Sequence, residues 1–320
     1  MIWYFLLTLH FLVEIIGIIS HVIFLKFMVI RGVMDGYARF NLGVISLSMI
    51  AMLVSYLAET LVCLSIGTVF EDAQCAQLDA KFYLTCIHRH SEMLSLTSLL
   101  FFTIERVLSI QFSKLHSSKV FQTSFILIFI FANAFSATYT YSVMLYEEST
   151  GLFWYMVLQI VILANFPFVY YAKRKSKSKY TAQVTTYSLK RKHNLYNYYE
   201  IARSFVFSIG IYLCAQLTVF TLLWLYLAQV LFPGEFHKLL FINVLIWNTN
   251  LSAFPWIVML IHRSQRERIY RIWMHMFPNN KYHPEQAGPP ESKIRGMNGK
   301  ELVTAPTQTD YFNQLQKAWE

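Results

Sequence analysis

Seven long runs of apolar residues alternate with short polar segments along the 320-residue chain. A helix that crosses about 30 Å of hydrocarbon needs roughly 20 apolar residues, and each run is long enough. The runs cover residues 3–30, 42–67, 82–110, 120–146, 152–172, 203–232 and 239–261. Because lipid-facing backbone must be hydrogen-bonded within its own segment, the pattern predicts an all-α, membrane-embedded bundle of seven transmembrane helices.

Composition supports lipid as the solvent for much of the surface. Hydrophobic residues make up 56% of the chain and charged residues only 14%, with a mean hydropathy of +0.41. Soluble domains carry about 25% charged residues. The first run has no basic residues before it and exceeds the roughly 7 to 15 apolar residues of a signal peptide, so we expect it to remain as a span.

The basic residues predict the orientation of the bundle. All but four of the 27 Lys and Arg residues fall after runs one and five, at the inner end of run three or after it, at the start of run six, or in the tail; the exceptions are Lys26, Lys81, Arg89 and Lys238. Basic residues concentrate in cytoplasmic loops. We therefore expect the amino terminus outside and the carboxyl terminus in the cytoplasm. The basic loop before run six either only orients the chain and touches anionic lipid or docks a cytoplasmic partner.

The segment after the last run predicts an eighth helix. In residues 262–277 apolar positions recur at the spacing of one helix face, with Arg266, Arg268 and Arg271 elsewhere, which is typical of an amphipathic helix at the cytoplasmic membrane surface. Residues 278–320, rich in Pro, Gly, Asn and charge, indicate a disordered cytoplasmic tail. We expect one membrane domain over residues 1–277 and the tail over 278–320.

Helical spacing aligns polar residues along two of the spans. At about 100° per residue, one face of the third span carries Arg106 and five other side chains: Phe102, Leu99, Ser95, Glu92 and His88. The first span aligns His10, Glu14, Gly17 and His21. Charged groups in a membrane are costly, so Glu14, Glu59, Arg89 and Glu92 should face protein or water. Glu92 is either a tie to Arg89 one turn away or a polar anchor for a ligand.

Two short motifs lie at informative positions. Glu105-Arg106-Val107, at the predicted cytoplasmic end of the third span, is similar to the Asp/Glu-Arg-Tyr motif of rhodopsin-like receptors. Pro167 and Pro255 match the usual receptor prolines of spans five and seven, although the neighbouring Asn and Tyr of span seven are missing.

The whole pattern resembles the nematode serpentine chemoreceptors, the G-protein-coupled receptors of the Sra, Srab, Srb and Sre superfamily. The resemblance rests on Glu105-Arg106, the short outer loops, and a long third inner loop whose Tyr187-Ser-Leu-Lys-Arg-Lys segment is followed by Glu200. It implies a chemosensory receptor of the plasma membrane, with sensory cilia as a candidate location. It implies a small-molecule odorant or other ligand and a heterotrimeric G protein as partners, with an activation switch at Glu105, Arg106, Glu200 and Pro255. We expect Arg106 to pair with Glu200 in the resting state.

A ligand would enter the outer half of the bundle. Polar candidates there are Glu59, His88, Glu92 and Ser95, and the aromatic candidates are Trp154, Trp224 and Trp247, together with Tyr155, Tyr226 and Phe241. Each aromatic residue alone is equally consistent with a membrane-interface belt or helix packing.

The remaining chemistry is sparse. Cys75 and Cys86 either form a disulfide on the oxidising side or stay free thiols, and the cysteines show no metal-ligand spacing. No nucleotide loop or hydrolase motif occurs, so we expect no enzymatic activity, cofactor or nucleic-acid partner. The alternatives are a ligand-gated channel or transporter, which predicts broken helices and repeats, and an intramembrane metal hydrolase, which needs converging His and Asp residues.

Overall fold

The computed structural model describes residues 2–30, 36–67, 75, 78–112, 116, 118–145, 147–182, 189–232, 234–262, 266 and 269–270. Seven helices in these ranges are long and apolar enough to cross a membrane, which confirms the predicted all-α bundle. They are α1 (Ile2–Phe24), continued by the π-helix η1 (Leu25–Ile30), α2 (Gly36–Ser65), α4 (Asp79–Gln111), α6 (Lys119–Leu145), α7 (Glu147–Ala182), α8 (Leu189–Leu227) and α9 (Phe236–Ile261).

The helices form one body. Contacts between Cα atoms divide the chain into Met1–Glu267, which holds all of these helices, and Arg268–Glu320. The predicted eighth helix over residues 262–277 lies largely outside the described residues, as does the predicted tail. The predicted division at residue 277 stays a prediction.

The third inner loop is shorter than the sequence predicts. Helix α7 continues through the basic residues to Ala182, and α8 begins at Leu189, well before the apolar run at residue 203. Lys and Arg are good helix formers and are solvated once the chain leaves the lipid. Hydropathy therefore marked where the membrane ends and not where the helices end.

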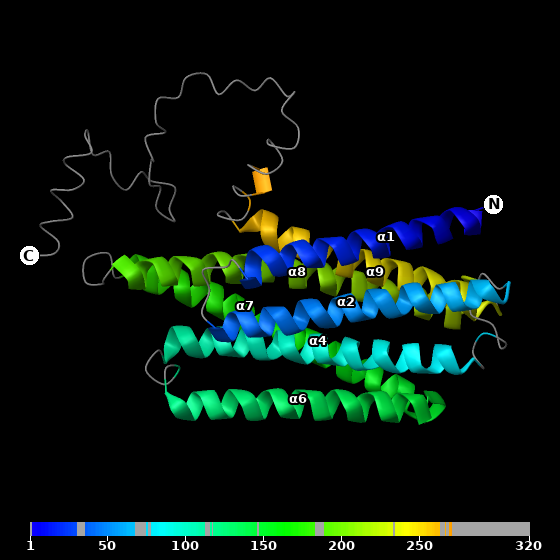
Figure 1. Cartoon of the computed structure of the whole chain (residues 1–320), viewed down its shortest axis with the longest axis horizontal. Helices are drawn as coiled ribbons and strands as arrows, with labels where there is room; N and C mark the ends of the chain where they lie inside the picture. The colour runs from blue at the N-terminus through cyan, green and yellow to red at the C-terminus, as the bar shows by residue number, and fades with distance from the viewer. Residues whose placement is uncertain are drawn as a thin grey trace, which may run out of the picture. The chain divides into compact units, whose positions relative to one another are not determined.

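Helix α4 occupies the interior of the bundle. It packs against α2, α6 and α7 and reaches α8, while α9 packs against α1 and α8 (Figure 1). Polar and charged side chains on α4 are buried, whereas α6 exposes large apolar side chains such as Ile126, Leu127, Ile130 and Phe131. Apolar groups outside and polar groups inside are what lipid requires of a helix bundle.

Small residues let α1 and α9 approach closely. Ser20 Oγ donates to the Ser252 carbonyl at 3.1 Å, and Ser252 Oγ donates to the Val13 carbonyl at 2.9 Å. A Cβ on Gly17 would lie 2.2 Å from Ser252 Oγ and 2.8 Å from Leu53 Cδ1. Only glycine fits at this crossing.

A proline break in α9 explains a second link between the helices. Pro255 has no N–H, so the Leu251 carbonyl four residues earlier loses its helical donor. His21 Nε2 lies 3.1 Å from that oxygen, and His21 Nδ1 lies 3.0 Å from Ser46 Oγ on α2. Since a carbonyl only accepts, Nε2 carries the proton, and one buried imidazole joins α1, α2 and α9.

We predict that Gly17→Ala destabilises the protein by about 1–3 kcal/mol, because the added methyl overpacks the crossing and Ser252 is held by its bond to Val13. Gly43→Ala is the matched control, since a Cβ there meets only Val29 Cγ1 at 3.7 Å. Thermal unfolding of the two purified variants measures the difference. Equal unfolding temperatures would show that the crossing is not tight.

Candidate functional site

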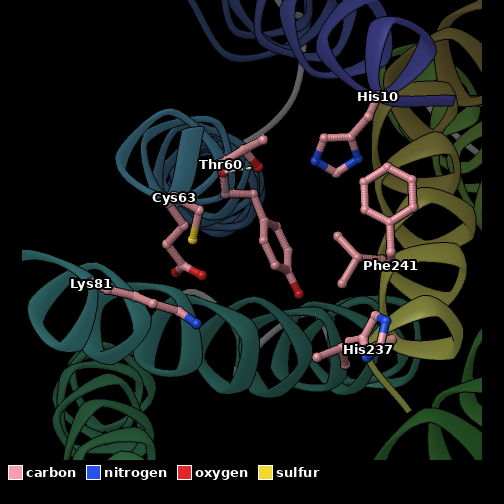
Figure 2. Close-up of a pocket in the computed structure, with 10 residues that line it drawn as sticks. His10, Thr60, Cys63, Lys81, His237 and Phe241 are labelled. Carbon is pink, nitrogen blue, oxygen red and sulfur yellow. Dashed lines mark hydrogen bonds between the residues drawn. The ribbon is translucent and has the colours of Figure 1, made fainter. Parts of the chain in front are cut away.

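A cavity of about 80 Å³ lies between α1, α2, α4 and α9 (Figure 2). Its walls carry His10 from α1; Tyr56, Glu59, Thr60 and Cys63 from α2; Lys81 from α4; and His237, Leu240, Phe241 and Val244 from α9. These positions fall near the start of α1, α4 and α9 and in the last turns of α2, so the cavity lies at one end of the bundle. We call this the disulfide end, because Cys63 is bonded to Cys75 there.

The disulfide corrects one expectation. Cys75 pairs with Cys63, at a Cα–Cα distance of 5.3 Å, and not with Cys86, which is free and half-buried on α4. Cys63 lies near the carboxyl end of α2 and faces the cavity, within reach of the segment that leaves α2. The signal was present in the sequence, since Cys63 falls near the outer end of the second apolar run. The bond ties the chain between α2 and α4 to the wall of the cavity.

His10 connects the cavity to the interior. Its Nε2 lies 2.9 Å from Glu14 Oε1, and Asn248 Nδ2 of α9 donates to the same oxygen at 2.9 Å. A carboxylate accepts, so Nε2 of His10 carries the proton, and Nδ1 of a neutral ring is then an acceptor. Among the described residues, Nδ1 has no hydrogen-bond partner, and the His10 side chain is 1% exposed.

The predicted face of the third span is buried as expected. The buried residues are His88, Glu92, Ser95, Leu99, Phe102 and Arg106, none of which is more than 8% exposed. Only Glu59 among the predicted polar ligand residues lines the cavity. His88 packs against the cavity residue Tyr56, with ring centroids 4.0 Å apart, and Ser95 Oγ donates to the Glu92 carbonyl at 2.8 Å.

Glu92 forms a tie between helices. It accepts from Arg89 Nη1 at 3.2 Å and from the Tyr139 hydroxyl of α6 at 3.0 Å. The interpretation of Glu92 as a partner of Arg89 is confirmed. Tyr139 adds an interhelical bond that helical spacing within one segment does not predict.

The three predicted tryptophans do not line this cavity. Trp154 donates to Ser142 Oγ at 2.8 Å and packs on Tyr139, so it joins α7 to α6. Trp247 packs on Tyr212 of α8 with centroids 4.8 Å apart, while Trp224 is 59% exposed. Sequence reasoning missed His10, Tyr56, Thr60, Cys63, Lys81 and His237 as cavity residues, although their polarity near the ends of apolar runs was a usable signal.

A second cluster surrounds Arg106 near the opposite end of α4, which we call the Arg106 end. Arg106 Nε donates to Glu105 Oε2 at 2.6 Å, and His116 Nε2 lies 2.6 Å from Glu105 Oε1. The guanidinium also lies 5.1 Å from the Tyr198 ring of α8. Both Glu105 and Arg106 are 3% exposed, so this ion pair is buried.

The other predicted switch residues lie on the helices around this cluster. Glu200 is buried on α8, with Oε1 3.8 Å from Arg203 Nη1. Pro255 lies in α9 beside the His21 link. A cavity of about 10 Å³ joins Arg106 to Val169 of α7 and Ala202 of α8. A direct pair between Arg106 and Glu200 stays a prediction.

In the part of the chain that the structure describes, no group of three or more His, Cys, Asp or Glu residues is placed to hold a metal ion. No protein-family model and no curated protein matches the chain. A solved structure does, the crystal structure of squid rhodopsin, with a TM-score of 0.63 and 14% sequence identity.

The fold is similar to that of squid rhodopsin. The match covers 86% of this chain and 86% of that chain, so it includes the helix bundle as a whole and not one pair of helices. At this identity the match establishes the rhodopsin-like fold alone.

We predict that the unreduced, unfolded chain contains two reactive thiols, those of Cys86 and Cys214, because Cys63 and Cys75 are bonded. Alkylation followed by peptide mapping measures which cysteines carry the label. Cys63→Ser should lower the unfolding temperature, since closing a short loop contributes about 2–4 kcal/mol, while Cys86→Ser is the neutral control. Labelling of Cys63 in the unreduced protein would contradict the assignment.

Proposed function

We propose that the chain is a G-protein-coupled receptor of the plasma membrane with a chemosensory role. A small molecule would bind in the cavity at the disulfide end, and a heterotrimeric G protein would bind at the Arg106 end. The observation that carries the proposal is the rhodopsin-like seven-helix fold with a buried Glu105-Arg106 pair near the end of α4. The resemblance of the sequence to nematode serpentine receptors supports the chemosensory role.

Charge supports the assignment of the two ends. The disulfide end requires oxidising conditions, which the outside of the cell provides. Basic residues gather at the opposite end, where the last turns of α7 hold Lys173, Arg174, Lys175, Lys177 and Lys179. The positive-inside rule places such an end in the cytoplasm, where it attracts an acidic protein surface as well as anionic lipid.

The Arg106 cluster has the features of a two-state element. A buried ion pair is costly unless its surroundings satisfy it, and here the satisfying groups come from different segments: His116 after α4 and Tyr198 on α8. A displacement of α8 would remove Tyr198 from Arg106 and open the small cavity beside it. We propose that this displacement makes room for the G protein.

A continuous set of contacts joins the two ends. At the cavity of the disulfide end, His10 is bonded to Glu14, and Glu14 is bonded to Asn248 on α9. Further along α9, Phe254 packs on Phe205 of α8, with ring centroids 5.8 Å apart. Phe205 in turn packs on Phe102 of α4, with ring centroids 4.8 Å apart. Phe102 lies under the Arg106 guanidinium at 5.8 Å. A ligand that moves α9 would thereby bias the packing of α8 against Arg106.

The proposal predicts that Glu200→Gln raises basal nucleotide exchange on a co-expressed Gα subunit about tenfold, because removing the negative charge weakens the resting contact of α8 with Arg106 by roughly 1–2 kcal/mol. Lys119→Gln, an exposed change at the same end, is the matched control. Exchange is measured in membranes with equal surface expression of each variant.

Unchanged exchange in the Glu200→Gln variant at normal surface expression would refute the Arg106 to Glu200 contact. An ion current that appears without any G protein would instead favour the channel alternative.

A further inference from the structure

The walls of the cavity at the disulfide end specify a class of ligand. Six of the ten lining residues have polar side chains other than cysteine: His10, Tyr56, Glu59, Thr60, Lys81 and His237. A site for an apolar volatile molecule would be lined mainly by aliphatic and aromatic groups. Here a purely apolar ligand would desolvate charged groups without replacing their contacts.

Lys81 supplies the first point of recognition. Its side chain is 5% exposed, so its positive charge lies at the wall of the cavity and away from bulk water. In Figure 2 the side chain extends along α4 toward the cavity. Its ammonium is a compact positive charge with three donors, which suits a ligand carboxylate that joins its existing contacts.

His10 supplies the second point. In Figure 2 it lies across the cavity from Lys81, and its ring extends into the space between α1 and α9. In the neutral ring that donates from Nε2 to Glu14, Nδ1 is an acceptor, and within the described part of the chain it has no hydrogen-bond partner, so it suits a donor from the ligand. A ligand amine or hydroxyl meets this requirement, and Glu59 adds a negative charge that favours an ammonium group.

Size sets the third restriction. A buried water molecule needs about 10–15 Å³ of cavity volume. The cavity volume of about 80 Å³ therefore accommodates roughly six non-hydrogen atoms. A three-carbon acid with one further polar group has that size.

We propose that the cavity binds a small acid that carries a hydrogen-bond donor beside its carboxylate, an α-amino acid or α-hydroxy acid. The carboxylate contacts Lys81 on α4, and the donor contacts Nδ1 of His10 on α1. This inference rests on the proposed receptor function and names the chemical class of its ligand. Because His10 is bonded to Glu14, and Glu14 to Asn248, occupation of the cavity acts directly on the α1 to α9 contact.

The test uses the full chain in lipid nanodiscs without G protein and a series of probes with five or six non-hydrogen atoms. These probes are L-alanine, L-lactate, propionate, which lacks the donor, L-alaninamide, which lacks the carboxylate, and 2-butanone, which lacks both. Binding is measured as the rise of the unfolding temperature with probe concentration. L-alanine and L-lactate should bind at least tenfold more tightly than the other three, and their order identifies whether an amine or a hydroxyl is preferred.

Variants assign the two contacts. Lys81→Met should remove the advantage of L-alanine over L-alaninamide, whereas Lys81→Arg should keep it. Lys238→Met is the matched control, because Lys238 lies in the first turn of α9 at the same end, bonded to Glu235 outside the cavity lining. His10→Leu should remove the advantage of L-alanine over propionate. If this variant fails to fold, the difference in binding between L-alanine and propionate on the unmodified protein still tests the need for a donor.

Three outcomes would overturn the ligand class: equal binding of propionate or 2-butanone, an unchanged carboxylate preference in Lys81→Met, or no stabilisation by any acid at about 10 mM. None of these depends on a G protein. If they occur while Glu200→Gln still raises nucleotide exchange, the ligand class is wrong and the receptor function stands. If the acids bind but nucleotide exchange on Gα does not change in the Glu200→Gln variant, the ligand class stands and the receptor function is wrong.

Discussion

The hydrogen bond from His21 of α1 to the Leu251 carbonyl of α9 determines how the first and last helices of the bundle pack together. Pro255 breaks the helical hydrogen bonding of α9 and leaves that carbonyl without a donor, a cost that lipid does not relieve. His21 satisfies it from α1 and, through Ser46, holds α2 at the same depth. The first and last spans are thus joined, and the close approach at Gly17 follows from that junction.

The same constraint, that polar groups must find partners inside, explains both ends of the molecule. At the disulfide end His10 and Asn248 both donate to Glu14 Oε1, and His10 also lines the cavity. At the Arg106 end Glu105, Arg106 and His116 form a buried cluster covered by Tyr198. Aromatic contacts among Phe254, Phe205 and Phe102 connect these regions through α9, α8 and α4. A receptor needs such a connection between a ligand site and a cytoplasmic surface.

Sequence reasoning recovered the spans, because hydropathy responds to the membrane, and it recovered the buried face of α4, because helical spacing is regular. The disulfide that it considered, between Cys75 and Cys86, was wrong, and most residues that line the cavity were not predicted. Cys63, Lys81 and His237 come from three helices, and a single sequence does not say which helix ends are neighbours. Aromatic residues such as Trp154 and Trp224 are chemically suited to pockets, interfaces and lipid alike, so their type alone could not separate these roles.

The proposed receptor function depends most directly on orientation, because it requires the cavity to open outside the cell and the Arg106 cluster to face the cytoplasm. The decisive measurement is antibody labelling of cells that express the chain with different epitopes at its two ends. The proposed function predicts that the amino-terminal epitope is labelled on intact cells and the carboxyl-terminal epitope only after permeabilisation. Labelling of the carboxyl-terminal epitope on intact cells would contradict it.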